Sequence, residues 1–121
     1  MPPQKIVLAD KAAHIQAPWT PGIVGALNGQ LVKLARTQGA FVWHAHQDED
    51  ELFLVLEGEL NIHFEDGSLC LRPGELCVVP RGVRHQPEGE ALILLFEPAS
   101  TRNTGEQDAA FTVEAEALTM L

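Results

Sequence analysis

Short runs of apolar residues recur along most of the chain, separated by residues that favour turns. Ten glycines and eight prolines interrupt them, a pattern typical of a domain built from short strands. Asn28-Gly29 predicts a tight hairpin, because a type I′ turn needs positive φ at both central residues. Without a long crossover helix, this spacing predicts an antiparallel sandwich or barrel. The predicted strands are 23–27, 30–36, 41–46, 52–57, 60–65, 69–72, 76–79 and 91–97.

The two ends of the chain carry a weaker pattern. Residues 8–15 are predicted to form two turns of helix, which Pro18 and Pro21 would end. Residues 98–110 are predicted to be irregular, and residues 111–121 are compatible with either strand or helix. We therefore expect one domain, residues 1–121, with a barrel core of about 23–97, an N-terminal arm of 1–22 and a C-terminal tail of 98–121.

The run from Leu52 to Leu56 departs from simple alternation, because apolar residues occupy both of its faces. One face would line the barrel interior. The other face needs cover from a second sheet or a second subunit. In so small a chain we prefer the second subunit and expect a homodimer.

Composition limits the classes of partner. Apolar residues make up 45% of the 121 residues, enough for a hydrophobic core, and the formal net charge is -9. An acidic chain lacks the basic surface that nucleic acids and anionic membranes need. Neither a signal peptide nor a membrane-spanning run is recognisable, which predicts a soluble cytoplasmic protein.

The two cysteines, Cys70 and Cys77, are too few for a disulfide scaffold. A tight hairpin at Pro73-Gly74 would place them opposite each other, so a cross-strand disulfide is one alternative. Reduced thiols are the default expectation for a cytoplasmic protein.

Four residues form a candidate metal site. His44 and His46 are two apart on a predicted strand, so their side chains leave the same face. Glu51 follows an acidic loop and, by parity, shares a face with Phe53; an antiparallel return would bring its carboxylate toward the histidines. His85 lies further along the chain, after a Pro-Arg-Gly turn.

Three imidazoles and a carboxylate suit borderline divalent ions: Fe, Mn, Ni, Co, Cu or Zn. On an octahedral ion these four ligands would leave two positions for water or substrate, whereas on tetrahedral zinc they would close the site. The identity of the metal therefore decides between a catalytic and a structural role.

These residues fall within two motifs that resemble those of small single-domain cupins. The first family motif has glycine, five residues, His-x-His, three or four residues, Glu, six residues and glycine. Here Gly39 is followed after four residues by His44-Ala45-His46, then by Glu51 and Gly58. The second motif has glycine, five residues, Pro-x-Gly, two residues, His, three residues and Asn.

The second motif begins here at Gly74, continues through Pro80-Arg81-Gly82 to His85, and has Gly89 in place of Asn. The resemblance covers about residues 23–97 and implies a double-stranded β-helix, or jelly-roll barrel. It also implies a metal held by His44, His46, Glu51 and His85. The two departures, a shorter first spacing and Gly89, leave these four positions filled.

The resemblance is a weak guide to the reaction, because cupins include isomerases, dioxygenases, cyclases, decarboxylases, sugar-binding regulators and storage proteins. We favour a metal-dependent enzyme acting on an oxygen-rich small metabolite, with Glu51 as candidate catalytic base. The alternative is a non-catalytic small-molecule-binding or sensor cupin whose metal orients the ligand. A purely structural metal site is a third hypothesis.

The remaining polar and aromatic residues offer candidate contacts to a substrate. Trp19 and Trp43 are interpreted as packing or dimer contacts, and His14 and His63 as having no role in the site. An arginine near the metal would suit an anionic substrate. The candidates are the apolar liners Phe53, Phe64 and Phe96 and the polar residues Arg36, Arg81, Arg84 and Gln86.

Overall fold

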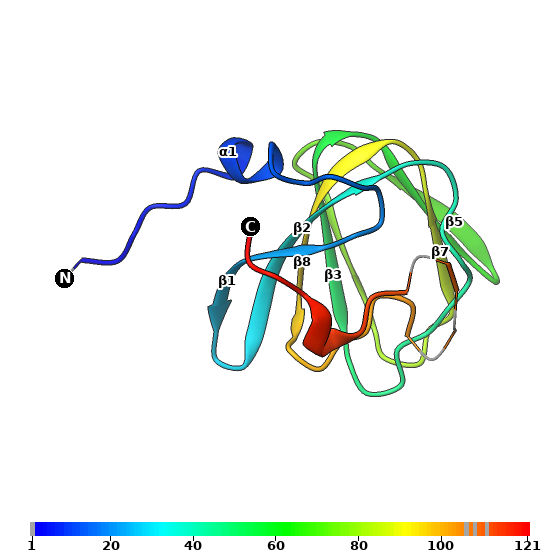
Figure 1. Cartoon of the computed structure of the whole chain (residues 1–121). Helices are drawn as coiled ribbons and strands as arrows, with labels where there is room; N and C mark the ends of the chain where they lie inside the picture. Colours follow the sequence, from blue (N-terminus) through cyan, green and yellow to red (C-terminus); the bar gives the residue numbers. More distant parts are fainter. Residues whose placement is uncertain (1, 106, 108, 111) are drawn as a thin grey trace.

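Eight strands make two antiparallel sheets in the computed structural model, which describes residues 2–105, 107, 109–110 and 112–121 (Figure 1). This arrangement confirms the predicted all-β jelly-roll barrel. The five-stranded sheet has the order β1 (Gly22–Leu27), β2 (Gln30–Thr37), β8 (Ala91–Pro98), β3 (Glu51–Gly58), β6 (Leu76–Val79). The three-stranded sheet has the order β5 (Gly67–Leu71), β4 (Leu60–Phe64), β7 (His85–Glu88).

The core lies between the two sheets. Val55 of β3 and Ile93 of β8 pack in one cluster with Leu60 and Ile62 of β4, and all four are at most 2% exposed. Because side chains alternate along a strand, the residues in register with this layer also point into the barrel. Glu51 and Phe53 of β3 share this inner face.

A second apolar cluster covers part of the outer face of the five-stranded sheet. The helix α1 (Leu8–Ala12) places Ala12 against Val24, Leu34 and Leu92. The helix has five residues rather than the predicted two turns. The sequence was compatible with either strand or helix for residues 111–121. The structure has a short 3-10 helix there, Ala115–Ala117, followed by an isolated bridge from Met120 to Ile23. Phe111 lies outside the described residues. No helix among the described residues has the length and apolar character to cross a membrane.

The other end of that outer face stays uncovered. Leu52 pairs in register with Val78, and Leu54 with Leu76. Leu76 and Val78 are 55% and 52% exposed, although both are large apolar residues. We call these four residues the β3–β6 outer face. The expectation that β3 is apolar on both faces is thus met, and part of the second face lies open to solvent.

Residues 41–46 do not form the predicted strand. One isolated bridge to β7 falls within them, His44 with His85, and a second one, Ala40 with Glu88, comes just before them. Phe41 donates its N–H to the carbonyl of Pro87, 2.9 Å away, but proline has no N–H to return the bond. A continuous ladder is therefore interrupted between the two bridges. The same proline explains why β7 was not expected as a strand.

The two cysteines are free and belong to strands of different sheets. The Pro73-Gly74 turn leads from β5 to β6, which belong to different sheets. Cys70 pairs in register with Asn61, whereas Cys77 pairs with Phe53. A disulfide across a hairpin was therefore wrong as an alternative, because no hairpin forms between these two strands.

Two glycines of the cupin-like motifs differ in how closely the surrounding backbone approaches them. Gly58 and Gly74 both have positive φ, 81° and 85°, but a Cβ at Gly58 would collide with the Glu90 carbonyl oxygen, whereas a Cβ at Gly74 would meet nothing within 4 Å. Gly74→Ala should cost about 1–2 kcal/mol of unfolding free energy for the backbone conformation alone. Gly58→Ala should cost a further ~1–3 kcal/mol because the backbone must shift. Chemical denaturation of both variants measures this, and equal losses would contradict the close approach.

Candidate metal centre

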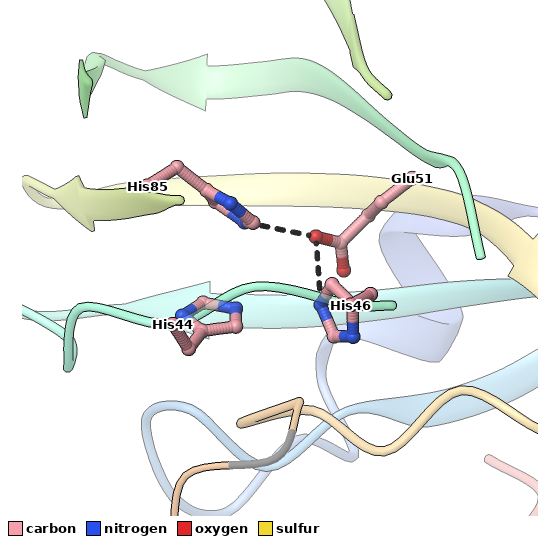
Figure 2. A group of neighbouring side chains, drawn as sticks. All are labelled: His44, His46, Glu51 and His85. Carbon is pink, nitrogen blue, oxygen red and sulfur yellow. Dashed lines mark hydrogen bonds and ion pairs between the residues drawn. The ribbon is translucent and has the colours of Figure 1, made fainter. Parts of the chain in front are cut away.

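The four predicted ligands come together at one end of the barrel interior (Figure 2). His44 and His46 lie between β2 and β3, Glu51 begins β3, and His85 begins β7. All four side chains are buried, with residue exposures of 4% or less. Segments distant in sequence and belonging to both sheets thus contribute to a single cluster.

The geometry of the cluster is compact. One donor atom from each residue lies within 4.8 Å of the others. Oε1 of Glu51 lies 3.3 Å from Nε2 of His46 and 3.3 Å from Nε2 of His85. The rings of His44 and His85 are 4.3 Å apart between centroids. This set of three nitrogens and one oxygen is of the kind that binds borderline divalent metals.

Backbone carbonyls orient two of the imidazoles. Nδ1 of His44 lies 2.9 Å from the carbonyl oxygen of Val42, and Nδ1 of His85 lies 2.9 Å from that of Val83. A carbonyl can only accept, so each Nδ1 carries a proton, and the neutral ring of His44 keeps a lone pair on Nε2. Fixing the tautomer in this way prepares a ring to bind metal through Nε2.

His46 supplies the test of whether these residues fit a metal. Its Nδ1 is buried with no partner within the part of the chain that the structure describes, and its Nε2 has only the 3.3 Å contact with Oε1 of Glu51, which is not a well-aligned hydrogen bond. An unsatisfied buried polar atom costs roughly 1–3 kcal/mol. A metal ion bound through one of these nitrogens would remove part of that penalty, so the residues fit such an ion.

The electrostatics keep two of the ligands, His44 and Glu51, in the protonation states that a metal requires. The pKa of His44 is lowered to about 4, mainly by burial and next by electrostatic interaction with the neighbouring His85. Burial alone would raise the pKa of Glu51, but its contacts with His46, His85 and Glu97 outweigh burial and hold this pKa well below its usual range. At neutral pH the site therefore holds a neutral His44 and an ionised Glu51.

The sequence analysis missed two buried residues beside this cluster. Lys33 of β2 and Glu97 of β8 are 1% and 2% exposed, and their Nζ and Oε1 atoms are 2.9 Å apart. Glu97 hydrogen-bonds Glu51; burial, followed by the charge of Glu51, raises the pKa of Glu97 well above its usual range. The alternation of side chains along β8 could have identified Glu97 as an inward-facing residue, since it shares the inner face of this strand with Leu95 and Ile93.

A small cavity of about 30 Å³ adjoins the cluster. Its walls are mainly apolar, with His44, Glu51, Glu97 and Asn103 as polar members. Trp19, expected to be a packing residue, is one of these walls and stacks on Phe41 with centroids 4.6 Å apart. This volume has room for one or two water-sized groups.

Of the three phenylalanines predicted to contact a substrate, only one lines the cavity. Phe53 lines the cavity, and Phe64 is partly buried against the core. Phe96 is in register with Leu52, so it lies on the outer face of β8, away from the cluster. Parity along β8 separates Phe96 from its inward neighbours Leu95 and Glu97.

The polar candidates are engaged elsewhere in the described structure. Arg81 is exposed and contacts Asp50, and Gln86 donates from Nε2 to the carbonyl of Phe41. Arg84 lies over the ring of Trp43, and Arg36 contacts the carbonyl of Ala12. His14 is exposed, and His63 contacts Ser68 and Glu88 on the three-stranded sheet.

The fold and the cluster define a class of protein that comparison with known proteins bears out. Residues 30–95 match the cupin domain family, and the chain belongs to this family. A solved cupin-2 domain containing protein from Shewanella frigidimarina is 40% identical, with a TM-score of 0.74; the match covers 77% of this chain and 93% of that one.

Two curated relatives match over shorter stretches. The uncharacterized protein YdbB of Bacillus subtilis is 41% identical over 64 residues, which cover 52% of this chain and 57% of YdbB. Homogentisate 1,2-dioxygenase of Emericella nidulans is 47% identical over 45 residues, which cover 35% of this chain and 10% of that protein. The chain thus spans little more than half of one relative and a tenth of the other.

The lowered pKa of His44 predicts how the stability of the metal-free protein depends on pH. The unfolded chain binds this proton near pH 6.5 and the folded chain near pH 4, so the unfolded state binds more protons between these values. The contribution of His44 to stability should therefore be lost as pH falls from about 6.5 to 4, by roughly 3 kcal/mol.

Chemical denaturation with a chelator present measures this loss. His44→Gln should show a shallower pH dependence than the parent protein, whereas the exposed control His14→Gln should match the parent. Identical slopes for His44→Gln and the parent would contradict a buried neutral imidazole.

Proposed function

We propose that the protein is a mononuclear cupin that binds one divalent transition metal through His44, His46, Glu51 and His85. The observation that carries this proposal is the buried set of four donors within 4.8 Å, in which neither nitrogen of His46 makes a hydrogen bond among the described residues. A metal left out of such a site would leave three inward-facing imidazoles poorly satisfied.

The favoured function is that of a small metal-dependent enzyme, isomerase-, cyclase- or dioxygenase-like, acting on an oxygen-rich small molecule. The metal, when bound, supplies a Lewis acid for substrate oxygens or, if it is iron, chemistry with O₂. Phe53 and Trp19 exclude water from one side of the cavity. Glu51 is the candidate base because its carboxylate borders the cavity and stays ionised.

The alternative is a cupin that binds or senses a small molecule without converting it. The cavity admits only a few atoms of ligand, and holding such a ligand against a metal needs no catalytic group. Soaking with small hydroxy and keto acids, followed by mass spectrometry of the recovered ligand, separates the two hypotheses. A changed ligand supports the enzyme, and an unchanged bound ligand supports the sensor.

Removing the carboxylate tests the metal site. Glu51→Gln keeps the shape of the side chain but loses the ionised oxygen, so metal affinity should fall at least about tenfold. His46→Ala should lose metal in the same way. Elemental analysis of protein purified without added metal, with chelator competition for the affinity, measures both effects.

Glu49→Gln is the matched control for this test. Its carboxylate lies two residues away and accepts a hydrogen bond from Ser100, 2.9 Å distant, so this variant should keep the affinity of the parent protein. Parent protein that contains and binds no metal would refute the proposal, and equal loss in Glu49→Gln would refute the choice of carboxylate.

We also propose that the β3–β6 outer face joins two copies of the chain into a homodimer. Leu76 and Val78 expose more than half of their surface there, next to the partly buried Leu52 and Leu54. A self-complementary apolar face of this kind is what a twofold dimer buries.

A lysine on this face should separate the copies. Val78→Lys places a charge within the proposed contact, and the fold should tolerate it because Val78 is half exposed. Sedimentation analysis should show a dimer for the parent protein and a monomer for Val78→Lys. Leu27→Lys, an equally exposed position on the opposite edge of the sheet, should remain dimeric; a monomeric parent protein would refute the proposal.

A further inference from the structure

A lysine and a glutamate form an ion pair inside the barrel. Lys33 and Glu97 come from the adjacent strands β2 and β8, and 2.9 Å separates Nζ from Oε1. Both side chains are almost fully buried. Because removing two charges from water costs several kcal/mol each, apolar residues of similar volume often serve stability as well or better. Packing alone therefore gives no reason for this pair.

Contact with the candidate metal ligand gives a reason. The carboxyl groups of Glu97 and Glu51 are close enough to hydrogen-bond when one proton lies between their oxygens, and both residues line the same cavity. Two carboxylates in contact within a dry site repel each other unless a proton or a cation lies close by. Lys33 supplies the cation on the far side of Glu97, so Glu51 stays available to the histidines.

We propose that Glu97, anchored by Lys33, is a positioning residue that holds the Glu51 carboxylate in the orientation that brings Oε1 to 3.3 Å from both His46 and His85. This inference rests on the metal-binding function proposed above and adds two residues to it. Lys33 and Glu97 are not ligands; they act through Glu51.

Positioning has an energetic consequence for metal binding. A free glutamate side chain loses up to about 2 kcal/mol of rotamer freedom when it is fixed. A carboxylate already held by Glu97 and the two imidazoles has lost much of that freedom before the metal arrives, and preorganisation of this kind strengthens binding. Without its hydrogen bond to Glu97, Glu51 must be ordered by the metal itself.

Two matched double variants separate positioning from packing. Changing Lys33 or Glu97 alone would leave the other charge buried without a partner, so both are replaced together. Lys33→Met with Glu97→Gln removes both charges and keeps an amide N–H that can donate to Glu51. Lys33→Met with Glu97→Leu removes both charges and the hydrogen bond. The two proteins differ only in the contact to Glu51.

Metal affinity and the absorption spectrum of the cobalt-loaded protein are the first readouts. We expect the Gln double variant to bind Co²⁺ and Zn²⁺ with an affinity close to that of the parent protein and with the same cobalt spectrum. The Leu double variant should bind them about 10–100-fold more weakly, with an altered cobalt spectrum. Wild-type affinity and an unchanged spectrum in the Leu double variant would overturn the proposal.

Crystal structures of the metal-free variants give a readout that does not need the metal-binding function. Glu51 should keep its contacts with His46 and His85 in the Gln double variant and leave them in the Leu double variant. An unmoved Glu51 in both would overturn the positioning role. Failure of the parent protein to bind any metal would instead refute the proposed function, and these structures would still decide the role of Glu97.

Glu97→Asp covers the case in which the Leu double variant does not fold. This change keeps the negative charge beside Lys33 and shortens the side chain by one methylene, so it cannot reach both Lys33 and Glu51. We expect weaker metal binding with thermal stability near that of the parent protein. Unchanged metal affinity in this variant would count against the positioning role.

Discussion

The constraint on which this structure depends is the cost of turning three imidazoles and a carboxylate into an apolar barrel. Each of these groups is hydrated in the unfolded chain, and the barrel removes that water. Most of the local structure offsets this cost by giving the buried groups polar partners. Val42 and Val83 offer carbonyls to two ring nitrogens, and the carboxylate of Glu51 lies between two imidazoles. Of the four groups, His46 is the least satisfied, because its Nδ1 has no partner within the described part of the chain, which makes it the clearest indication of a bound metal.

The fold brings these groups together where its two sheets meet. His44 and His85 exchange backbone hydrogen bonds of 3.0 and 2.8 Å, which tie the segment before β3 to β7. On the other side, a Cβ at Gly105 would collide with the carbonyl oxygen of Ala45, so the chain after β8 packs directly on the histidine segment. The ligands are therefore held by backbone contacts on both sides, and their geometry does not depend on a long flexible loop.

The sequence predicted the candidate site better than the strand that carries it. The alternation of His44 and His46 identified two ligands although Pro87 prevents a regular ladder there. Parity likewise selected Glu51 from its acidic neighbours. Lys33 escaped notice for a physical reason: Lys33, Leu34 and Ala35 are all buried in succession, because α1 covers the outer face. Where both faces of a strand are buried, alternation cannot tell an inward lysine from a solvated one.

The charged side chains inside the barrel differ in balance from those on its surface. The surface carries most of the acidic excess of nine charges, whereas three formally charged side chains are buried among the described residues: Lys33, Glu51 and Glu97. Burial and the charge of Glu51 raise the pKa of Glu97, because two carboxyl groups share the interior with one lysine. In a low-dielectric interior the negative charge of two carboxyl groups is costly unless a cation lies close by. Lys33 pairs with Glu97, and a divalent cation at the four-donor cluster would lie beside Glu51. The buried charges are therefore arranged so that they favour a bound cation.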